Sequence, residues 1–331
     1  MSRQSPSQGI RRLFVTGCAV LFFTVAQQSH AQAPLQKVPI SYSSGGITSI
    51  DLFIARERGF FREEGLEGQL IQMRASTAIA AGISGDVDAL GSIGSAIRGI
   101  QRGAPLRVVA VTLRRPLFWL ISRPEFRSIK ELKGKVLGVV TIGGSQHTMA
   151  KRMLTLGGLD PDKDLTTVQV GEESVQLQAL VGNTIQVAAI SPPIFLVGRD
   201  KYKMNILDSS VDKFTSIQNG LAVNVKTLQE RPELVKKMLR ARAKGNRYFH
   251  ENERGASELL ARLWNTDFNV ALETYRLSKP AFAQNGIPTE GEIKEYLALD
   301  AQILKLPEPV AASKVFDFGL QKDVNRELGI K

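Results

Sequence analysis

The sequence predicts an α/β protein of two lobes, in which each lobe is a mainly parallel β-sheet flanked by helices. Two observations lead to this fold class. Short apolar runs rich in Val and Ile alternate with longer segments of helical periodicity, which is typical of parallel sheets covered by helices. The chain has 331 residues, more than a single domain usually contains, and this length favours two lobes.

The first 33 residues have the pattern of a secretory signal peptide. Arg3, Arg11 and Arg12 form a basic region without acidic residues, and an apolar run of 14 residues follows at 13–26. A membrane span needs roughly 20 apolar residues, so this run is too short for an anchor. Ala31 and Ala33 frame a small-residue cleavage signal, and we expect cleavage after Ala33. The arginine pair leaves both the general and the twin-arginine export routes open.

The mature chain has a composition that excludes several kinds of chemistry. Removing 33 residues leaves 298, with 40 basic and 32 acidic side chains and a net charge of +8. The single cysteine, Cys18, is lost, so the sequence predicts no thiol nucleophile and no disulfide. Only His147 and His250 remain, and we therefore expect no metal site and no cofactor. The basic residues are scattered among acidic ones, which argues against nucleic acid as a partner.

In the first block, each element is predicted from a local pattern. Strands are expected at 37–43, 65–73, 86–92 and 106–113, where short apolar runs end in turn residues. Ile47, Ile50 and Ile54 recur at helical spacing and predict a helix over 47–59, with Gly59 as its cap. Helices over 77–85 and 93–103 are likewise closed by a glycine.

The second block begins near Ser128 and repeats the alternation. A short helix is expected at 128–134, and longer helices at 144–158, 174–183 and 192–203. The strands predicted between them cover 135–141, 165–170, 185–191 and 203–209. After about residue 216 the sequence predicts a mainly helical chain, with helices at 232–252, 256–265, 268–283 and 290–305.

Four predicted strands end in small or hydroxyl residues that lead into a helix. These loops are Ser43 to Gly46, Leu90 to Ser95, Thr141 to Gln146, and Ser191 to Pro193. A helix N-terminus has free backbone N–H groups and a partial positive charge, and glycine lets a ligand approach them closely. Because ligands of open α/β sheets bind at the carboxyl ends of strands, the loops predict a binding cleft. Serine and glycine are also ordinary helix caps, so each single loop has a purely structural alternative.

Known phosphate and catalytic motifs are absent from these loops. The sequence contains neither G-x-x-x-x-G-K-[ST] nor a G-x-G-x-x-G after the first strand, which argues against a nucleotide enzyme. His147 is the best candidate for a general base, but no G-x-S-x-G or comparable motif supplies a nucleophile for it. Arg114 follows a strand and could bind an acid group of a ligand.

Several phrases in a fixed order resemble ABC-transporter substrate-binding proteins of the nitrate/sulfonate/taurine type. They are IDLFIARERGFFREEGLE, GISGDVDALGSIGSAIRGIQRGAPLRVVAV, SIKELKGKVLGVVTIGGSQHTMAKRMLTLGGLDPD and QALVGNTIQVAAISPP. The superfamily also includes binders of the pyrimidine precursor of thiamine. The resemblance implies a type II periplasmic-binding-protein fold, localisation in the periplasm, and a monomer that delivers a small molecule to an inner-membrane permease. It further implies a first lobe of residues 34–120 plus 217–331 and a second lobe of residues 121–216.

The resemblance also implies which residues contact the ligand and how it is held. Closure of the two lobes by hinge motion is expected to capture a small anionic organic compound, such as a sulfonate or carboxylate. Neutral heterocycles stay open as ligands, since hydroxyl-rich loops bind them too. The expected ligand-binding residues are Ser43, Ser44, Gly45, Gly46, Thr48, Ser92, Ser95, Arg114, Gly143, Gly144, Ser145, Gln146, His147, Ser191, Pro192 and Asn219. Apolar contacts are expected from Ile47, Phe118 and Ile142.

Two departures from the family pattern bear on function. Gln186 stands where such proteins commonly have an aspartate, at a position that is structural in the family. The thiamine-precursor synthases of the superfamily use cysteine- and histidine-rich motifs, and the mature chain has no cysteine, which argues against an enzyme. The alternatives are an exported enzyme with His147 as its base and a ligand-sensing module for a membrane receptor.

Overall fold

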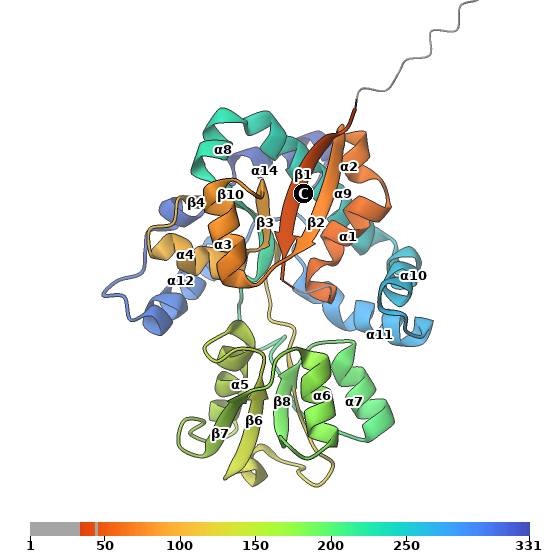
Figure 1. Cartoon of the computed structure of the whole chain (residues 1–331), viewed down its shortest axis with the longest axis vertical. Coiled ribbons are helices and arrows are strands. Elements are labelled where there is room, and N and C mark those ends of the chain that lie inside the picture. Colours follow the sequence, from red (N-terminus) through yellow and green to blue (C-terminus); the bar gives the residue numbers. More distant parts are fainter. Residues whose placement is uncertain (1–33, 44–45) are drawn as a thin grey trace, which may run out of the picture. The chain divides into compact units, whose positions relative to one another are not determined.

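Two five-stranded sheets form the framework of the chain (Figure 1). The computed structural model describes residues 34–43 and 46–331. The predicted signal peptide and the loop residues Ser44 and Gly45 therefore lie outside the described residues. From Leu35 to Lys331 the chain forms one compact unit that contains both sheets.

The first sheet is mainly parallel, with a single antiparallel strand inside it. Its order is β2-β1-β3-β10-β4. Strand β1 pairs in parallel with β2 and β3, whereas β10 runs antiparallel to β3 and β4. The strands are β1 (Gln36–Tyr42), β2 (Leu66–Gln72), β3 (Ala89–Ser92), β4 (Leu106–Leu113) and β10 (Asn219–Asn224).

The second sheet has the equivalent order, β7-β6-β8-β5-β9. Strand β6 pairs in parallel with β7 and β8, and β5 is the antiparallel strand between β8 and β9. The strands are β5 (Trp119–Ser122), β6 (Lys135–Val139), β7 (Leu165–Gln169), β8 (Val187–Ile190) and β9 (Asn205–Ser209). The predicted fold class, two mainly parallel sheets flanked by helices, is confirmed.

The chain after residue 216 is mainly helical, as predicted, but strand β10 is an element that the sequence analysis missed. Its six residues, NGLAVN, lie between β3 and β4 and are covered on both faces. Leu221 and Val223 pack in a cluster with Met238, whereas Ala222 packs on the other face with Ile97. A strand that is buried on both faces has no alternation of polar and apolar residues, so its periodic signal is lost.

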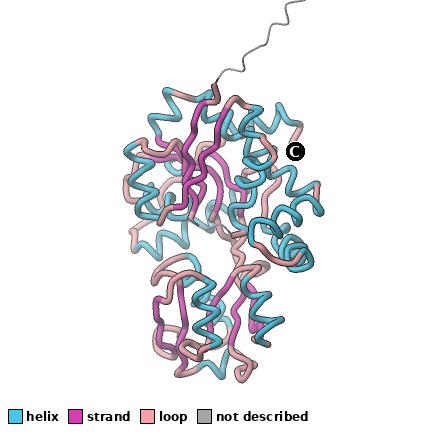
Figure 2. Tube along the Cα trace, turned by 45° about the vertical axis from the view of Figure 1, so that its right-hand side comes forward, coloured by secondary structure: helices cyan, strands magenta, loops and turns pink. Residues whose placement is uncertain are grey.

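Helices flank the first sheet on both faces (Figure 2). Leu52 of α1 and Met238 of α9 pack with Val38 and Ile40 of β1, while Ile97 of α4 packs on the opposite face. The elements before β5 are η1 (Ile47–Ser49), α1 (Ile50–Glu57), α2 (Phe60–Glu63), α3 (Ala75–Ser84) and α4 (Ile93–Gln101). Those after β10 are α8 (Val225–Glu230), α9 (Pro232–Glu251), α10 (Glu253–Trp264), α11 (Phe268–Ser278), η3 (Lys279–Ala281), α12 (Glu290–Leu304), α13 (Ala312–Val315) and α14 (Gly319–Leu328).

The second sheet is covered by three α-helices. Met153 of α5 packs against Leu137 and Val187, and Phe195 of α7 lies on the other face, stacked 4.5 Å from Trp119. The elements are η2 (Ile129–Leu132), α5 (Ser145–Leu156), α6 (Glu173–Val181) and α7 (Ile194–Tyr202). The short helix predicted at 128–134 is thus a single 3-10 turn.

Two crossover segments join the sheets, one between β4 and β5 and the other between β9 and β10. They are bonded to each other: Ser216 N–H donates to the Arg114 carbonyl at 3.1 Å, and Phe118 N–H donates to Ser210 Oγ at 3.0 Å. These two segments are the covalent connections between the two sheets.

A buried ion pair ties α1 and α9 to the first sheet. Arg242 of α9 donates from Nε to Asp51 Oδ2 of α1 at 2.6 Å and from Nη2 to Thr112 Oγ1 of β4 at 3.0 Å. Asp51 is 0% exposed and Arg242 is 1% exposed. Both charged groups are therefore shielded from water, and removing either side chain would leave the other as an unpaired buried charge.

Candidate functional site

Two serines lie together at the carboxyl ends of neighbouring strands of the first sheet. Ser43 follows β1, and Ser92 is the last residue of β3 and precedes α4. Their hydroxyl oxygens are 2.8 Å apart, and Ser43 N–H donates to Ser92 Oγ at 3.0 Å. Since each hydroxyl has one donor and two acceptor positions, the pair keeps hydrogen-bonding capacity for a ligand.

Asn219 lies next to this serine pair in the first sheet and binds the segment that follows β1. It pairs with Ser92 in the ladder between β10 and β3 and is buried. Its side-chain amide donates to the Thr48 carbonyl at 2.7 Å and to Ser49 Oγ at 3.2 Å. Asn219 therefore fixes the 3-10 turn that begins after Gly46, and its donors are already engaged.

The first amides of α4 are used by the chain itself. The N–H groups of Ile93 and Gly94 both donate to the Gln218 carbonyl, at 2.9 and 3.2 Å. Gln218 precedes β10, so the same crossover that completes the sheet covers this helix N-terminus. Ser95, in the first turn of α4, is half-buried. These two amides are therefore not free to bind an anion, although the sequence analysis expected them to do so.

The loop after β6 also folds back on itself. Gly143, at a φ of +79°, donates its N–H to His147 Nδ1 at 2.9 Å, and Gly144 N–H donates to the Thr141 carbonyl at 3.0 Å. Gln146 is buried, and its Oε1 accepts the Val140 N–H at 2.7 Å. Ser145 is the first residue of α5. The predicted residues lie at the end of β6, but the side chains of Gln146 and His147 are engaged in hydrogen bonds with the backbone of this segment.

The geometry of His147 argues against a role as a general base. Burial lowers the pKa of His147, and the nearby Lys151 lowers it further, so the imidazole is neutral. Because Nδ1 accepts the Gly143 N–H, the single ring proton of the neutral imidazole resides on Nε2. Neither nitrogen then has a free lone pair with which to take a proton from a substrate.

Glu173 is a site residue that sequence reasoning missed. It begins α6, and its Oε2 accepts both the Ser191 N–H at 2.9 Å and the Ser191 hydroxyl at 2.5 Å. Burial raises the pKa of Glu173 to about 7, against the opposing hydrogen bonds from Ser191. The sequence analysis did not single out this residue. A carboxyl group thus stands at the end of β8, where an anion-binding loop was expected.

The raised pKa of Glu173 predicts a specific pH dependence of stability. The folded protein keeps this proton between pH 4.5, the usual value, and about 7, whereas the unfolded chain loses it. The contribution of Glu173 to stability is therefore fully present below pH 4.5 and is lost as the pH rises to about 7. Glu173→Gln retains an acceptor for Ser191 without the charge. We expect it to be more stable than the wild type at pH 8, by on the order of 1 to 3 kcal/mol.

Urea unfolding between pH 5 and pH 8 measures this difference. The control is Glu308→Gln, which removes an exposed carboxylate and should leave the pH dependence of unfolding unchanged. If Glu173→Gln and the wild type lose stability in parallel as the pH rises, Glu173 does not carry the proton.

The remaining predicted residues lie in different parts of the structure. Pro192 is buried next to Ser191, and Arg114 lines a separate hollow together with His250 and Lys279. Of the expected apolar contacts, Ile47 lies in the core, Phe118 is half-buried and Ile142 is exposed. Ser44 and Gly45 lie outside the described residues.

The chemistry available at the strand ends is hydrogen bonding. Among residues 34–43 and 46–331, no group of three His, Cys, Asp or Glu side chains is placed to hold a metal ion. In the same part of the chain, no helix has both the length and the apolar character needed to cross a bilayer. Hydroxyls, side-chain amides and one carboxyl group can bind and orient a polar molecule.

Comparisons with known proteins show which family and which relative this chain resembles. The model of the family described as "NMT1/THI5 like" matches residues 47–256. Over 235 residues the chain is 27% identical to the riboflavin-binding protein RibY of Chloroflexus aurantiacus; the match covers 67% of this chain and 65% of RibY, just under two thirds.

Two solved structures illustrate the likeness in fold. The periplasmic aliphatic sulphonate-binding protein SsuA of Escherichia coli matches with a TM-score of 0.68 and 15% identity, over 85% of this chain and 92% of SsuA. The periplasmic nitrate-binding protein NrtA of Synechocystis PCC 6803 matches with a TM-score of 0.65 and 13% identity, over 90% of both chains. The predicted resemblance to substrate-binding proteins of this type is confirmed.

Proposed function

Because this chain belongs to the NMT1/THI5-like family and has the periplasmic-binding-protein fold, we propose that it is the solute-binding component of an ABC importer. In this proposal the mature protein works in the periplasm, captures a small molecule and delivers it to a permease in the inner membrane. The lobes are residues 34–120 with 217–331 and residues 121–216, as the sequence predicts.

One observation supports the proposal most directly: equivalent strands of the two sheets end in polar pairs. In the first sheet Ser43 and Ser92 follow β1 and β3. In the second sheet Ser191 follows β8, the counterpart of β3, and is bonded to Glu173. Ligands of α/β proteins bind at the carboxyl ends of strands, and a ligand held by both pairs would bridge the sheets.

The ligand class that this geometry favours is a polar, neutral molecule with hydrogen-bond donors. The amides of Ile93, Gly94 and Gly143 are bonded within the chain, so few free N–H groups remain for an anion. Glu173 would repel a sulfonate or carboxylate when charged, but it accepts hydrogen bonds from N–H or O–H groups. A hydroxyl- or N–H-bearing heterocycle fits these conditions better than the anion expected from sequence. Riboflavin, which the relative RibY is named for binding, is of this class.

Capture by movement of the lobes is supported by the two bonded crossover segments. Closure of this kind is driven by the greater affinity of the closed form for the ligand. Contacts beyond the segments also join the two parts: Arg199 of α7 binds Glu273 of α11 through two hydrogen bonds of 2.7 and 3.0 Å. Such contacts would have to adjust as the lobes move.

A non-enzymatic role is supported by the state of His147, whose two ring nitrogens are both unable to act as a base. Incubation of the protein with its ligand would then leave the ligand chemically unchanged, as measured by mass spectrometry. Turnover that disappears in His147→Ala would instead support the enzymatic alternative.

A thermal-shift screen tests the proposal. Protein freed of bound ligand by unfolding and refolding is mixed with riboflavin, pyrimidine precursors of thiamine, sulfonates, carboxylates and nitrate. A ligand at about 100 times its dissociation constant is expected to stabilise the fold by about 2.7 kcal/mol. We expect this effect from a neutral heterocycle bound at the serine pairs; any stabilisation by an anion should be the same in Ser92→Ala as in the wild type.

Matched serine variants then locate the binding site. Ser92→Ala removes one hydroxyl of the pair and should weaken the ligand about tenfold, as loss of one hydrogen bond to a buried ligand implies. Ser84→Ala, at the end of α3, is the control and should bind as the wild type does. If no compound stabilises the protein, or Ser92→Ala and Ser84→Ala bind a ligand equally well, the proposal is wrong.

A further inference from the structure

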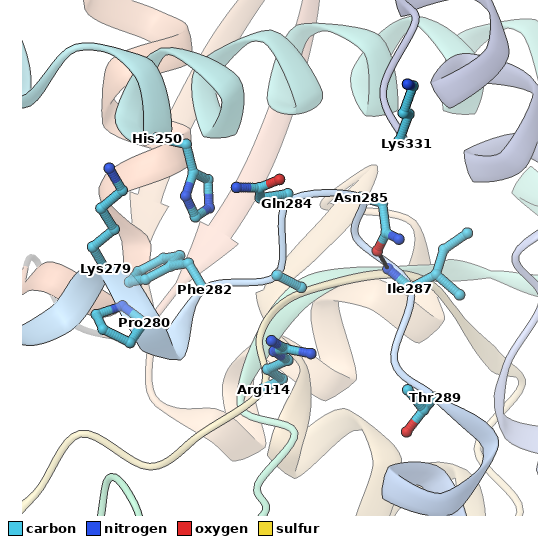
Figure 3. A pocket seen from close by; sticks show the side chains of 11 residues that line it. Arg114, His250, Lys279, Pro280, Phe282, Gln284, Asn285, Ile287, Thr289 and Lys331 are labelled. Carbon is cyan, nitrogen blue, oxygen red and sulfur yellow. Dashed lines mark hydrogen bonds between the residues drawn. The ribbon is translucent and has the colours of Figure 1, made fainter.

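A hollow of about 520 Å³ lies beside the end of α9 and the segment from Lys279 to Thr289 (Figure 3). Its lining includes three cationic side chains, those of Arg114, Lys279 and Lys331, together with His250. The described residues that line it include no Asp or Glu. A concave site with one sign of charge attracts ligands of the opposite sign.

The wall of this hollow is fixed by the first sheet and by α9. Ala283 N–H donates to the Thr112 carbonyl at 2.8 Å, and Arg114 N–H donates to the Ala281 carbonyl at 3.0 Å. From the other side, the Asn246 side chain donates to the carbonyls of Ala283 and Gln284, at 2.7 and 3.1 Å. The hollow is therefore built before any ligand arrives, which lowers the entropic cost of binding.

Two nitrogen atoms at this hollow are buried without a partner. Arg114 Nε and His250 Nε2 have no hydrogen-bond partner among the described residues. The acidic group paired with Arg114 is Glu292, whose Oε1 lies 3.6 Å from Nη1, beyond hydrogen-bond distance. Buried polar groups are almost always bonded, so it is notable that Arg114 Nε, which can only donate, has no acceptor and that His250 Nε2 has no partner of either kind.

The charges of the hollow act on one another. Burial, together with the positive charges of Lys279 and Arg114, lowers the pKa of His250 to about 4. At neutral pH the imidazole is uncharged and can donate a hydrogen bond from one nitrogen. Gln284 also lines the hollow, and its side-chain amide is a second neutral donor (Figure 3).

We propose that this hollow binds an oxyanion group, a carboxylate or phosphate of a small molecule, between Arg114 and Lys279 with His250 and Gln284 as hydrogen-bond donors. The site is separate from the strand-end site, because Ser43, Ser92 and Ser191 do not line it. Its position adds a consequence. The Arg114 carbonyl accepts the Ser216 N–H, so an anion held by Arg114 would contact a residue that links the two crossover segments.

Titration of the mature protein with inorganic phosphate, and separately with acetate and citrate, tests the site. Ionic strength is kept constant, and the imidazole signals of His250 are followed by NMR. Binding is expected to shift these signals with saturation and to raise the pKa of His250, because a nearby anion favours the charged imidazole. Whether phosphate or the carboxylates saturate the site first identifies the class of group that it holds.

Lysine variants separate this site from general charge effects. Lys279→Gln should weaken binding about tenfold, the effect of losing one charge-assisted contact. Lys133→Gln removes the same charge from a side chain that is 73% exposed and should leave binding unchanged. Equal weakening in both variants, or His250 signals that respond to none of the three anions, overturns the proposal. A loss in Lys279→Gln counts only if its melting temperature matches the wild type, and Arg114→Gln provides a second test.

Discussion

Replacing Asp51 by alanine is expected to destabilise the protein by about 3–5 kcal/mol, the cost of leaving a buried charge without its partner. Arg242 would keep its guanidinium inside the first lobe, where 1% of the residue is exposed and the remaining bond is to Thr112. Urea unfolding at pH 7 measures the loss. Since most domains are stable by only 5–15 kcal/mol, a change of this size would be visible without any ligand.

Two further variants separate burial of the charge from loss of contacts. In the double variant Asp51→Ala/Arg242→Met no charge remains, and part of the lost stability should return. Glu258→Ala breaks the exposed pair with Arg254, whose side chains are 54% and 85% exposed, and should cost less than about 0.5 kcal/mol. A loss below about 1 kcal/mol in Asp51→Ala would mean that water reaches Arg242.

Replacing Gly220 by alanine is expected to cost about 3 kcal/mol, at the upper end of the range for overpacking. A Cβ atom at Gly220 would lie 1.9 Å from the Ala110 carbonyl oxygen and 2.7 Å from Ile93 Cδ1. The first contact is with backbone in the neighbouring strand, so a change of rotamer cannot relieve it. Because Asn219 precedes Gly220 and holds the turn at Thr48, we expect the variant to weaken ligand binding as well.

The control for Gly220 is Gly291, at the start of α12. A Cβ atom there would meet Thr289 Oγ1 at 4.0 Å, an ordinary contact. Gly291→Ala should leave the stability unchanged or raise it by up to about 1 kcal/mol, because alanine favours the helix. A small effect of Gly220→Ala in chemical unfolding would show that β10 and β4 can move apart.

The strand ends could be predicted from sequence because their signals are local. Ser43, Ser92 and Ser191 each follow a short apolar run and precede helical periodicity, and the structure has strands and helices at these positions. Their partners could not be predicted. The Glu173–Ser191 bond joins residues 18 positions apart and forms because α6 begins close to the end of β8. A sequence pattern indicates the acid at the start of a helix, but not where its side chain points.

Strand β10 escaped prediction for a different physical reason. Its sequence is short, begins with Asn219-Gly220, and is apolar on both faces, so neither length nor alternation marks it as a strand. The same strand decides the state of the α4 amides, since the Gln218 carbonyl just before it accepts two of them. The expectation of an anionic ligand therefore depended on an element that the sequence did not reveal. Whether the remaining residues bind the ligand stays a prediction.

The place of β10 in the first sheet also has a consequence for biosynthesis. Residues 119–209 contain every strand of the second sheet in one continuous stretch, so that sheet can pair as soon as this stretch is available. The first sheet has to wait until residue 224, because β10 separates β3 from β4. Until then both strands expose unpaired backbone groups, which are prone to pair with other chains. The sheet that contains β1 is therefore the one that is completed last.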